Sequence, residues 1–398
     1  LYRRGRGVEQ NDIRAFSLYM SSAEQGNPYA SLELAKMYRD GLGTEPDLQQ
    51  AEWRFQNAYS GFVVLEEKSH DDKLQYRIGQ MLHTGTGTSK DDEGAARYWE
   101  KSAKLGNINA QYALGTLWLE TGSGDSGQAV EWLTKAANAE HSAAQYVLGK
   151  LYQDGVYFNK DMDQAMKWFR SAAELGNEYA AYRMGCLLLL GEEIPKDVEA
   201  AVKWLSLSAE KGNPYAQYRL GMLYLKGEEY SPQVEVAMKW LQQAAEQKNE
   251  WAFYQLGKLY LSGEHVTKNV ETAVHYLGLC AEKGNQYAQY ALGKLYLCGR
   301  DVSRDREKAV EYLTASAEQG NLYASFLLEH LDAYQDPSLF LAATRLLHHL
   351  EKLFCEEVQR PMEMKRYQID RKRRRKLSEK KQAQGHHRED QEPAQGIY

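Results

Sequence analysis

Gly-Asn steps recur along this chain at a constant spacing of 36 residues. Lys248-Asn249 continues the same lattice in altered form, and the regular steps are Gly176-Asn177, Gly212-Asn213, Gly284-Asn285 and Gly320-Asn321. A period of about 20 to 50 residues is typical of stacked repeats rather than of one globular core. The period therefore predicts the fold class before composition is considered, and it makes an enzyme less expected than a scaffold.

The lattice extends toward the start of the chain with two interruptions. It passes through His141 and Gly106-Asn107 with a slip of two residues between them, and it returns at Gly26-Asn27. The wide gap between Asn27 and Asn107 predicts a hidden repeat that carries an insertion at residues 60–72. We therefore expect about nine motifs over residues 1–335, the second of them enlarged and the ninth degraded after Leu328.

Each motif reads as two short helices joined at the Gly-Asn step. In the first helix, an alanine is followed three residues later by a large aromatic residue and five residues after that by a second alanine, which places all three near one stripe. The aromatic residues are Tyr98, Trp132, Trp168, Trp204, Trp240, Tyr276 and Tyr312. Packing between repeats is the favoured role of this ladder, and stacking on a ligand is the alternative.

The second helix of each motif carries an interior glycine. Glycine in a helix interior costs about 1 kcal/mol relative to alanine. Its recurrence therefore needs a packing reason, and we expect another helix to approach closely there. The positions are Gly79, Gly115, Gly149, Gly185, Gly221, Gly257 and Gly293. Other glycines follow the helix ends, where they fit the left-handed residue that commonly terminates a helix, and the asparagine of each Gly-Asn step can cap or begin the next helix.

These patterns carry a family resemblance. Ala-Trp in the first helix, Ala-Glu-x-Gly-Asn at the turn and Tyr-Ala-x-Tyr-x-Leu-Gly-x-Leu-Tyr in the second helix resemble the Sel-1-like repeat family, which is related to the tetratricopeptide repeats. The resemblance covers roughly residues 9–335. It implies an all-α, right-handed superhelical solenoid of antiparallel helix pairs that serves as a scaffold for a partner protein or peptide.

No catalytic or metal-binding motif accompanies the repeats. The ten histidines form no His-Glu-x-x-His pattern, and no G-x-S-x-G or P-loop sequence occurs. The four cysteines form no C-x-x-C pair, which favours small buried side chains over a nucleophile or metal ligand; they are Cys186, Cys280, Cys298 and Cys355. We therefore predict a protein that is not an enzyme and has no cofactor or metal.

The cysteine usage and the hydropathy bear on location. Unpaired cysteines suit a reducing compartment, and no apolar stretch approaches the roughly 20 residues that a membrane-spanning helix needs. We expect a cytoplasmic protein with no membrane contact. The chain begins at Leu1 without an initiator methionine, which suggests a fragment of a longer chain. An upstream domain could then hold any catalysis.

A recognition surface is expected on the first helices beside the aromatic ladder. Lys203, Lys239, His275 and Glu311 occupy equivalent positions with different charges, as a surface adapted to a partner shows. Trp204 and Trp240 directly follow Lys203 and Lys239, and Trp168 takes the same place in the preceding repeat. We expect these three tryptophans to take part in partner binding as well. An ordinary solvated helix face, whose residues vary freely, is the alternative interpretation.

Two further segments follow the repeats. Asp336-Pro337 is a good helix start, and the apolar stripe that follows predicts a capping helix over residues 336–358, with docking on another protein as the alternative. Residues 359–398 form a basic tail that we expect to be largely disordered or helical. From residue 360 onward it holds twelve Lys or Arg and six Asp or Glu.

The densest charge in the tail predicts contact with nucleic-acid phosphates, which is salt-sensitive and independent of base sequence. The expected contact residues are Arg371, Lys372, Arg373, Arg374, Arg375, Lys376, Lys380 and Lys381. A merely solvated tail, or contact with a membrane or an acidic protein, are the alternatives. Residues 373–386 also resemble, more weakly, the C-terminal region of mobilisation relaxases from Gram-positive conjugative elements, which implies an accessory module of a DNA-mobilisation protein.

Overall fold

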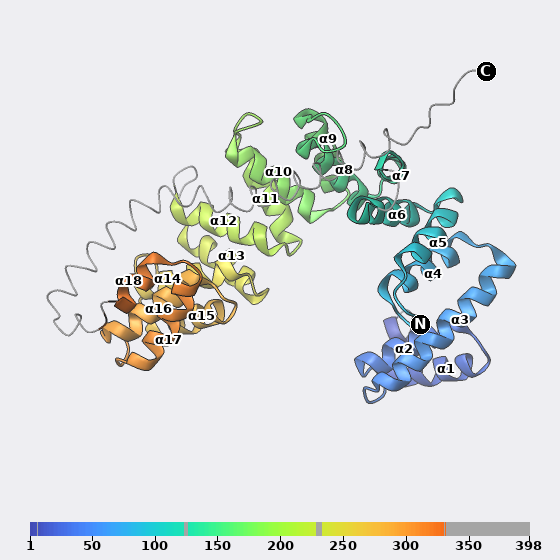
Figure 1. Ribbon diagram of the computed structural model, residues 1–398, viewed down its shortest axis with the longest axis horizontal. Coiled ribbons are helices and arrows are strands. Elements are labelled where there is room, and N and C mark those ends of the chain that lie inside the picture. The colour runs from blue at the N-terminus through green and yellow to red at the C-terminus, as the bar shows by residue number, and fades with distance from the viewer. Residues whose placement is uncertain (6, 123–125, 228–232, 330, 332–398) are drawn as a thin grey trace, which may run out of the picture. The chain divides into compact units, whose positions relative to one another are not determined.

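The computed structural model describes residues 1–5, 7–122, 126–227, 233–329 and 331 (Figure 1). The secondary structure of these residues is entirely helical, as the repeat pattern predicts. The chain divides into two compact units, Leu1–Ala252 and Phe253–Tyr398, and each is described by itself. The predicted capping helix at 336–358 and the basic tail at 359–398 lie outside the described residues.

Nine helix pairs follow one another in the described part of the chain, after a short 3-10 helix, η1 (Tyr2–Arg4). The first unit contains α1 (Asp12–Glu24), α2 (Pro28–Asp40), α3 (Leu48–Ser69), α4 (Asp72–Thr84), α5 (Asp92–Lys104), α6 (Ile108–Thr121), α7 (Ser126–Asn138), α8 (Ser142–Asp154), α9 (Met162–Glu174), α10 (Glu178–Leu190), α11 (Val198–Glu210), α12 (Pro214–Lys226) and α13 (Val234–Glu246). The unit boundary falls within α14 (Glu250–Ser262), and the second unit continues with α15 (Val270–Glu282), α16 (Gln286–Cys298), α17 (Arg306–Glu318) and α18 (Leu322–Glu329). Odd-numbered helices are the first helices of their repeats, and even-numbered helices are the second.

The insertion in the second repeat lengthens a helix. Helix α3 has 22 residues, whereas the equivalent helix α5 has 13. Residues 60–69 continue α3 without a break, and Phe62 and Glu66 on this extension are buried. Gln75 at the start of α4 donates to the Glu66 carboxylate over 2.8 Å. The extra residues are therefore packed against the array instead of forming a loop.

The turn between the two helices of a repeat has the backbone that the Gly-Asn step predicts. Gly212 adopts φ 93° after α11, a left-handed conformation in which a side chain is unfavourable. Asn213 then caps α12 by accepting from the backbone N–H groups of Tyr215 and Ala216. Glu140 and Lys248 take the glycine position in two repeats and adopt φ 62°. The regular spacing of the Gly-Asn steps therefore reflects the regular spacing of the turns that join the two helices of each repeat.

His141 replaces the capping asparagine in the fourth repeat. Its Nδ1 accepts from the backbone N–H of Ala144 over 3.2 Å, and its ring stacks on Tyr112 with centroids 4.6 Å apart. Burial lowers the pKa of His141, since the charged imidazolium is poorly solvated there. The neutral ring is also the form that can accept the capping hydrogen bond.

This cap predicts a pH-dependent stability. Because the folded-state pKa lies below the unfolded value of about 6.5, the contribution of His141 is present above that pH and is lost as the pH falls. We expect His141→Asn to preserve the cap and to be less sensitive than wild type between pH 8 and pH 5. His141→Ala should lose about 1 kcal/mol at pH 8. Amide exchange in α8 measures both effects, and equal pH dependence in wild type and His141→Asn would contradict the assignment.

Interior glycines of the second helices sit directly beneath side chains of the next repeat. A Cβ built on Gly221 would lie 2.7 Å from Cγ of Leu241 and 3.2 Å from the carbonyl oxygen of Ala237 on α13. The expected close approach of another helix is thus confirmed. The side chain that fills each contact follows the ladder aromatic by one residue and is buried in every case: Trp99, Leu133, Phe169, Leu205, Leu241, Leu277 and Leu313.

Hydrogen bonds between repeats supplement this packing. The buried Ser208 hydroxyl donates to the carbonyl oxygen of Glu178 over 2.7 Å, and Ser316 makes the same bond to Gln286. These bonds join a first helix to the opening turn of the preceding second helix. Cys280, which takes the same position in α15, is fully buried. It therefore lies at a packing position of the repeat.

Candidate functional site

The predicted recognition residues are exposed on the first helices. Lys203 on α11 and Lys239 on α13 belong to the first unit, and His275 on α15 and Glu311 on α17 belong to the second. Each directly precedes the ladder aromatic of its own helix. Lys203 and Lys239 therefore occupy equivalent positions on consecutive first helices of one unit, whereas the other two lie in the separately described unit.

The tryptophans of the ladder are half-buried and pack against the preceding repeat. Trp168 contacts the cluster formed by α7 and α8, Trp204 the cluster of α9 and α10, and Trp240 the cluster of α11 and α12. Packing between repeats, the favoured interpretation of the ladder, agrees with these contacts. Each indole nevertheless retains some exposure to solvent.

A hollow of about 430 Å³ opens beside Trp240. Its walls come from one repeat and from the first helix of the next: Ala209, Glu210, Gly212, Gln217, Trp240, Gln243, Glu246 and Gln247. The amide of Gln247 donates to the side-chain carbonyl of Gln217 over 2.8 Å across this hollow. Polar groups at this inter-repeat position are thus satisfied by one another.

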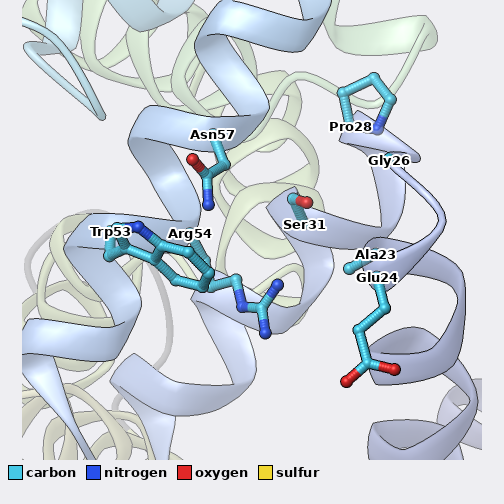
Figure 2. A pocket seen from close by; sticks show the side chains of 8 residues that line it. All are labelled: Ala23, Glu24, Gly26, Pro28, Ser31, Trp53, Arg54 and Asn57. Carbon is cyan, nitrogen blue, oxygen red and sulfur yellow. The ribbon is translucent and has the colours of Figure 1, made fainter.

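A second hollow, of about 440 Å³, occupies the equivalent position between the first and second repeats (Figure 2). Its lining is Ala23, Glu24, Gly26, Pro28, Ser31, Trp53, Arg54 and Asn57. Arg54 lies three residues after Ala51, so it stands where Trp240 stands three residues after Ala237. Sequence reasoning missed this substitution, although alignment of the enlarged repeat on Ala51 provides the signal.

The second helices carry a row of tyrosine pairs. Within the first unit, the ring centroids of Tyr182 and Tyr215 lie 6.2 Å apart, and Tyr146 and Tyr179 pair in the same way at 6.3 Å. Burial raises the pKa of Tyr182; neighbouring Cys186 raises it further, and the Arg219 guanidinium opposes the rise. Tyr182 is therefore a neutral phenol at physiological pH. These rings provide aromatic surface along the second helices, which sequence reasoning assigned only to the repeat consensus.

The described residues contain no group of three or more His, Cys, Asp or Glu side chains placed to hold a metal ion. Cys186 and Cys298 are half-buried free thiols in this part of the chain, and burial raises the pKa of Cys298. A raised pKa lowers the thiolate fraction, so this thiol is a poor nucleophile. Cys355 lies outside the described residues.

None of the helices in the described residues is both long and apolar enough to cross a membrane. The expected phosphate-contacting residues, Arg371 to Lys376 with Lys380 and Lys381, lie outside the described part of the chain. The nucleic-acid hypothesis consequently rests on the sequence of the tail.

Comparison with known proteins identifies the repeat. The Sel1 repeat profile matches nine segments, at residues 1–27, 28–53, 73–107, 108–141, 142–177, 178–213, 214–249, 252–285 and 286–321. The crystal structure of a Sel1 repeat protein from Oxalobacter formigenes is 32% identical, with a TM-score of 0.54, and the match covers 70% of this chain and 79% of that one.

Curated relatives match over shorter stretches. An exopolysaccharide production negative regulator from Rhizobium meliloti is 30% identical over 135 residues, which are 31% of this chain and 48% of that protein. The ERAD-associated E3 ubiquitin-protein ligase component HRD3A from Arabidopsis thaliana is 29% identical over 116 residues, 28% of this chain and 16% of the relative. The chain thus spans about half the length of the first relative, and far less of the second. With nine matched repeats along its helix pairs, the chain belongs to the Sel1 repeat family.

Proposed function

We propose that this protein is a non-catalytic scaffold that binds a partner protein or peptide on the faces of its first helices. The observation that carries the proposal is the contrast between neighbouring positions. Lys203 and Lys239 are exposed and change to His275 and Glu311 in later repeats, whereas the residues two positions further on in these four repeats are all buried leucines: Leu205, Leu241, Leu277 and Leu313. Stacking is served by the constant residues, and the varied positions are free for recognition.

Family membership supports this function. Sel1 repeat proteins are generally protein-interaction scaffolds, and the relatives named above are a regulator and a component of a larger ligase. A cytoplasmic location fits the unpaired cysteines, and a bacterial source fits the resemblance of residues 373–386 to mobilisation relaxases. We assign it no catalytic step, cofactor or metal.

Site-specific photo-crosslinking tests the proposed face. A photoreactive amino acid at position 203 or 239 should capture one defined partner in the producing cell, whereas the same group at Glu192, an exposed loop residue of the same unit, should not. With the purified partner, Lys203→Glu combined with Lys239→Glu should weaken binding by about tenfold, because charge reversal opposes an attractive interface. Equal capture from position 192, or unchanged affinity of the double variant, would contradict the proposed face.

A second candidate function follows from the six consecutive cations Arg371 to Lys376. Under it, the repeats recruit a protein while the tail contacts nucleic-acid phosphates, as in an accessory module of a DNA-mobilisation protein. Binding to nonspecific duplex DNA should then fall steeply with salt and should be lost without residues 360–398. Tail-independent binding, or no binding at low salt, would reject this function and leave the scaffold proposal intact.

A further inference from the structure

Arg54 occupies a position at which the later repeats carry an aromatic residue. The equivalent residues from the third repeat onward are Tyr98, Trp132, Trp168, Trp204, Trp240, Tyr276 and Tyr312. Three substitutions coincide at this inter-repeat hollow, because Ser31 and Gly61 stand where Gln217 and Gln247 form their amide pair. The hollow of the first two repeats therefore contains a cation and lacks the pair of glutamine amides that the equivalent hollow provides.

The guanidinium of Arg54 is buried without a charged partner. The residue is only 8% exposed, and its Nε has no hydrogen-bond partner. Its Nη2 donates to the sulfur of Met20 over 3.1 Å, and Cζ lies 4.5 Å from the ring centroid of Trp53. A thioether is a weak acceptor, and an indole face compensates only part of the lost hydration. A buried cation of this kind is costly unless an anion accompanies it.

The hollow places neutral polar groups and one carboxylate around this cation. In Figure 2 the guanidinium extends into the space between Trp53 and Ser31, and the amide of Asn57 is directed toward the same space. Glu24 lines the rim, and its carboxylate lies apart from the guanidinium in this view. No carboxylate of the described residues lies within 4.0 Å of the Arg54 nitrogens, the limit for an ion pair.

We propose that this hollow, the Arg54 pocket, binds a single carboxylate of a peptide ligand. A planar guanidinium fork matches a carboxylate in two parallel hydrogen bonds. The one cation of Arg54 balances a ligand with one negative charge, whereas a dianionic phosphate would remain undercompensated and would be repelled more strongly by Glu24 on the rim. Trp53, which is 49% exposed, offers apolar surface for the atoms next to the carboxylate.

The pocket lies between the first and second repeats, on α1, α2 and α3, and is therefore a different site from Lys203 on α11 and Lys239 on α13. The carboxylate of the ligand could be the C-terminus of a peptide or the side chain of an acidic residue. Three small probes distinguish these sources. N-acetylglycine represents a chain terminus, N-acetylglutamic acid α-amide represents a side chain, and N-acetylglycinamide is the neutral control.

Binding is measured on the full chain by NMR of ¹⁵N-labelled arginine side chains, with the Arg54 signal identified by its loss in Arg54→Met. We expect at least one of the acidic probes to shift the Arg54 Nε–H resonance saturably, with affinity at least about tenfold greater than that of the neutral probe. The tighter acidic probe identifies the source. Arg54→Lys keeps the charge without the planar fork, and it should bind that probe about tenfold more weakly while retaining the thermal unfolding midpoint of the wild type.

Four results would overturn the proposal. They are an unshifted Arg54 resonance, equal binding of the neutral probe, tighter binding of inorganic phosphate than of either carboxylate, and binding that requires Glu24→Gln. The last result would mean that Glu24 already neutralises the guanidinium in solution. Binding that is unchanged or strengthened in Glu24→Gln would instead support the pocket, because removal of a rim charge reduces repulsion of an anion.

Discussion

Replacement of Gly293 by valine is expected to destabilise the second unit by about 3 kcal/mol. A Cβ at Gly293 would lie 2.7 Å from Cγ of Leu313 and 3.2 Å from the carbonyl oxygen of Ala309. The leucine cannot retreat, because it is fully buried, and the carbonyl belongs to the backbone of α17. Helices α16 and α17 must therefore separate to admit the new side chain.

Gly278 offers a matched control in the same unit. It also lies within a helix, α15, but a Cβ there would meet no atom within 4 Å. Valine has the higher helix propensity, so Gly278→Val should stabilise by about 0.3 kcal/mol. The same substitution thus has opposite expected signs at two helical glycines, which separates close helix packing from intrinsic helix preference.

Amide exchange in α16 and α17 is the suitable measurement, because unfolding of a repeat array need not be two-state. The free energy of opening in these helices should fall in Gly293→Val and stay near the wild-type value in Gly278→Val. Equal protection in the two variants would show that the close approach at Gly293 does not constrain the array.

The repeat architecture could be predicted from the sequence because the same residues recur at equivalent positions in many copies. The glycine at 212 and the asparagine at 213 predicted the left-handed turn and the helix cap, since both features depend on local backbone chemistry. The interior glycines predicted a close helix approach, but the contacting side chain was not singled out. Leu241 directly follows the larger Trp240, and successive side chains on a helix point in different directions, so only one of the two can face Gly221. The contacting residue is Leu241.

The site was less predictable because burial depends on packing between repeats. Exposure of Lys203 and Lys239 agrees with the first-helix pattern, yet exposure alone does not identify a partner. Arg54 lay hidden in the enlarged second repeat, where an extra segment breaks the lattice. Its burial depends on α1 and α2, and that arrangement cannot be read from the charge of an arginine in the sequence.

Arg54→Met should raise the stability of the first two repeats by about 1–3 kcal/mol in the absence of ligand. Methionine has a similar length and removes a buried cation whose Nε has no hydrogen-bond partner. Most substitutions of buried residues destabilise a protein, so a gain here is a specific expectation. Amide exchange in α2 and α3 measures the free energy of opening, and a loss of protection would show that the guanidinium is already compensated.

The reciprocal substitution, Trp240→Arg, completes the test at the equivalent hollow of the first unit. It removes an aromatic side chain that packs on the cluster of α11 and α12, and we expect a loss of about 2 kcal/mol. Glu210 and Glu246 line this hollow and could pair with the new cation, which limits the loss. If Arg54→Met stabilises while Trp240→Arg destabilises, the repeat position itself favours an apolar side chain. The arginine at position 54 is then retained at the expense of stability, which is the expected signature of a binding residue.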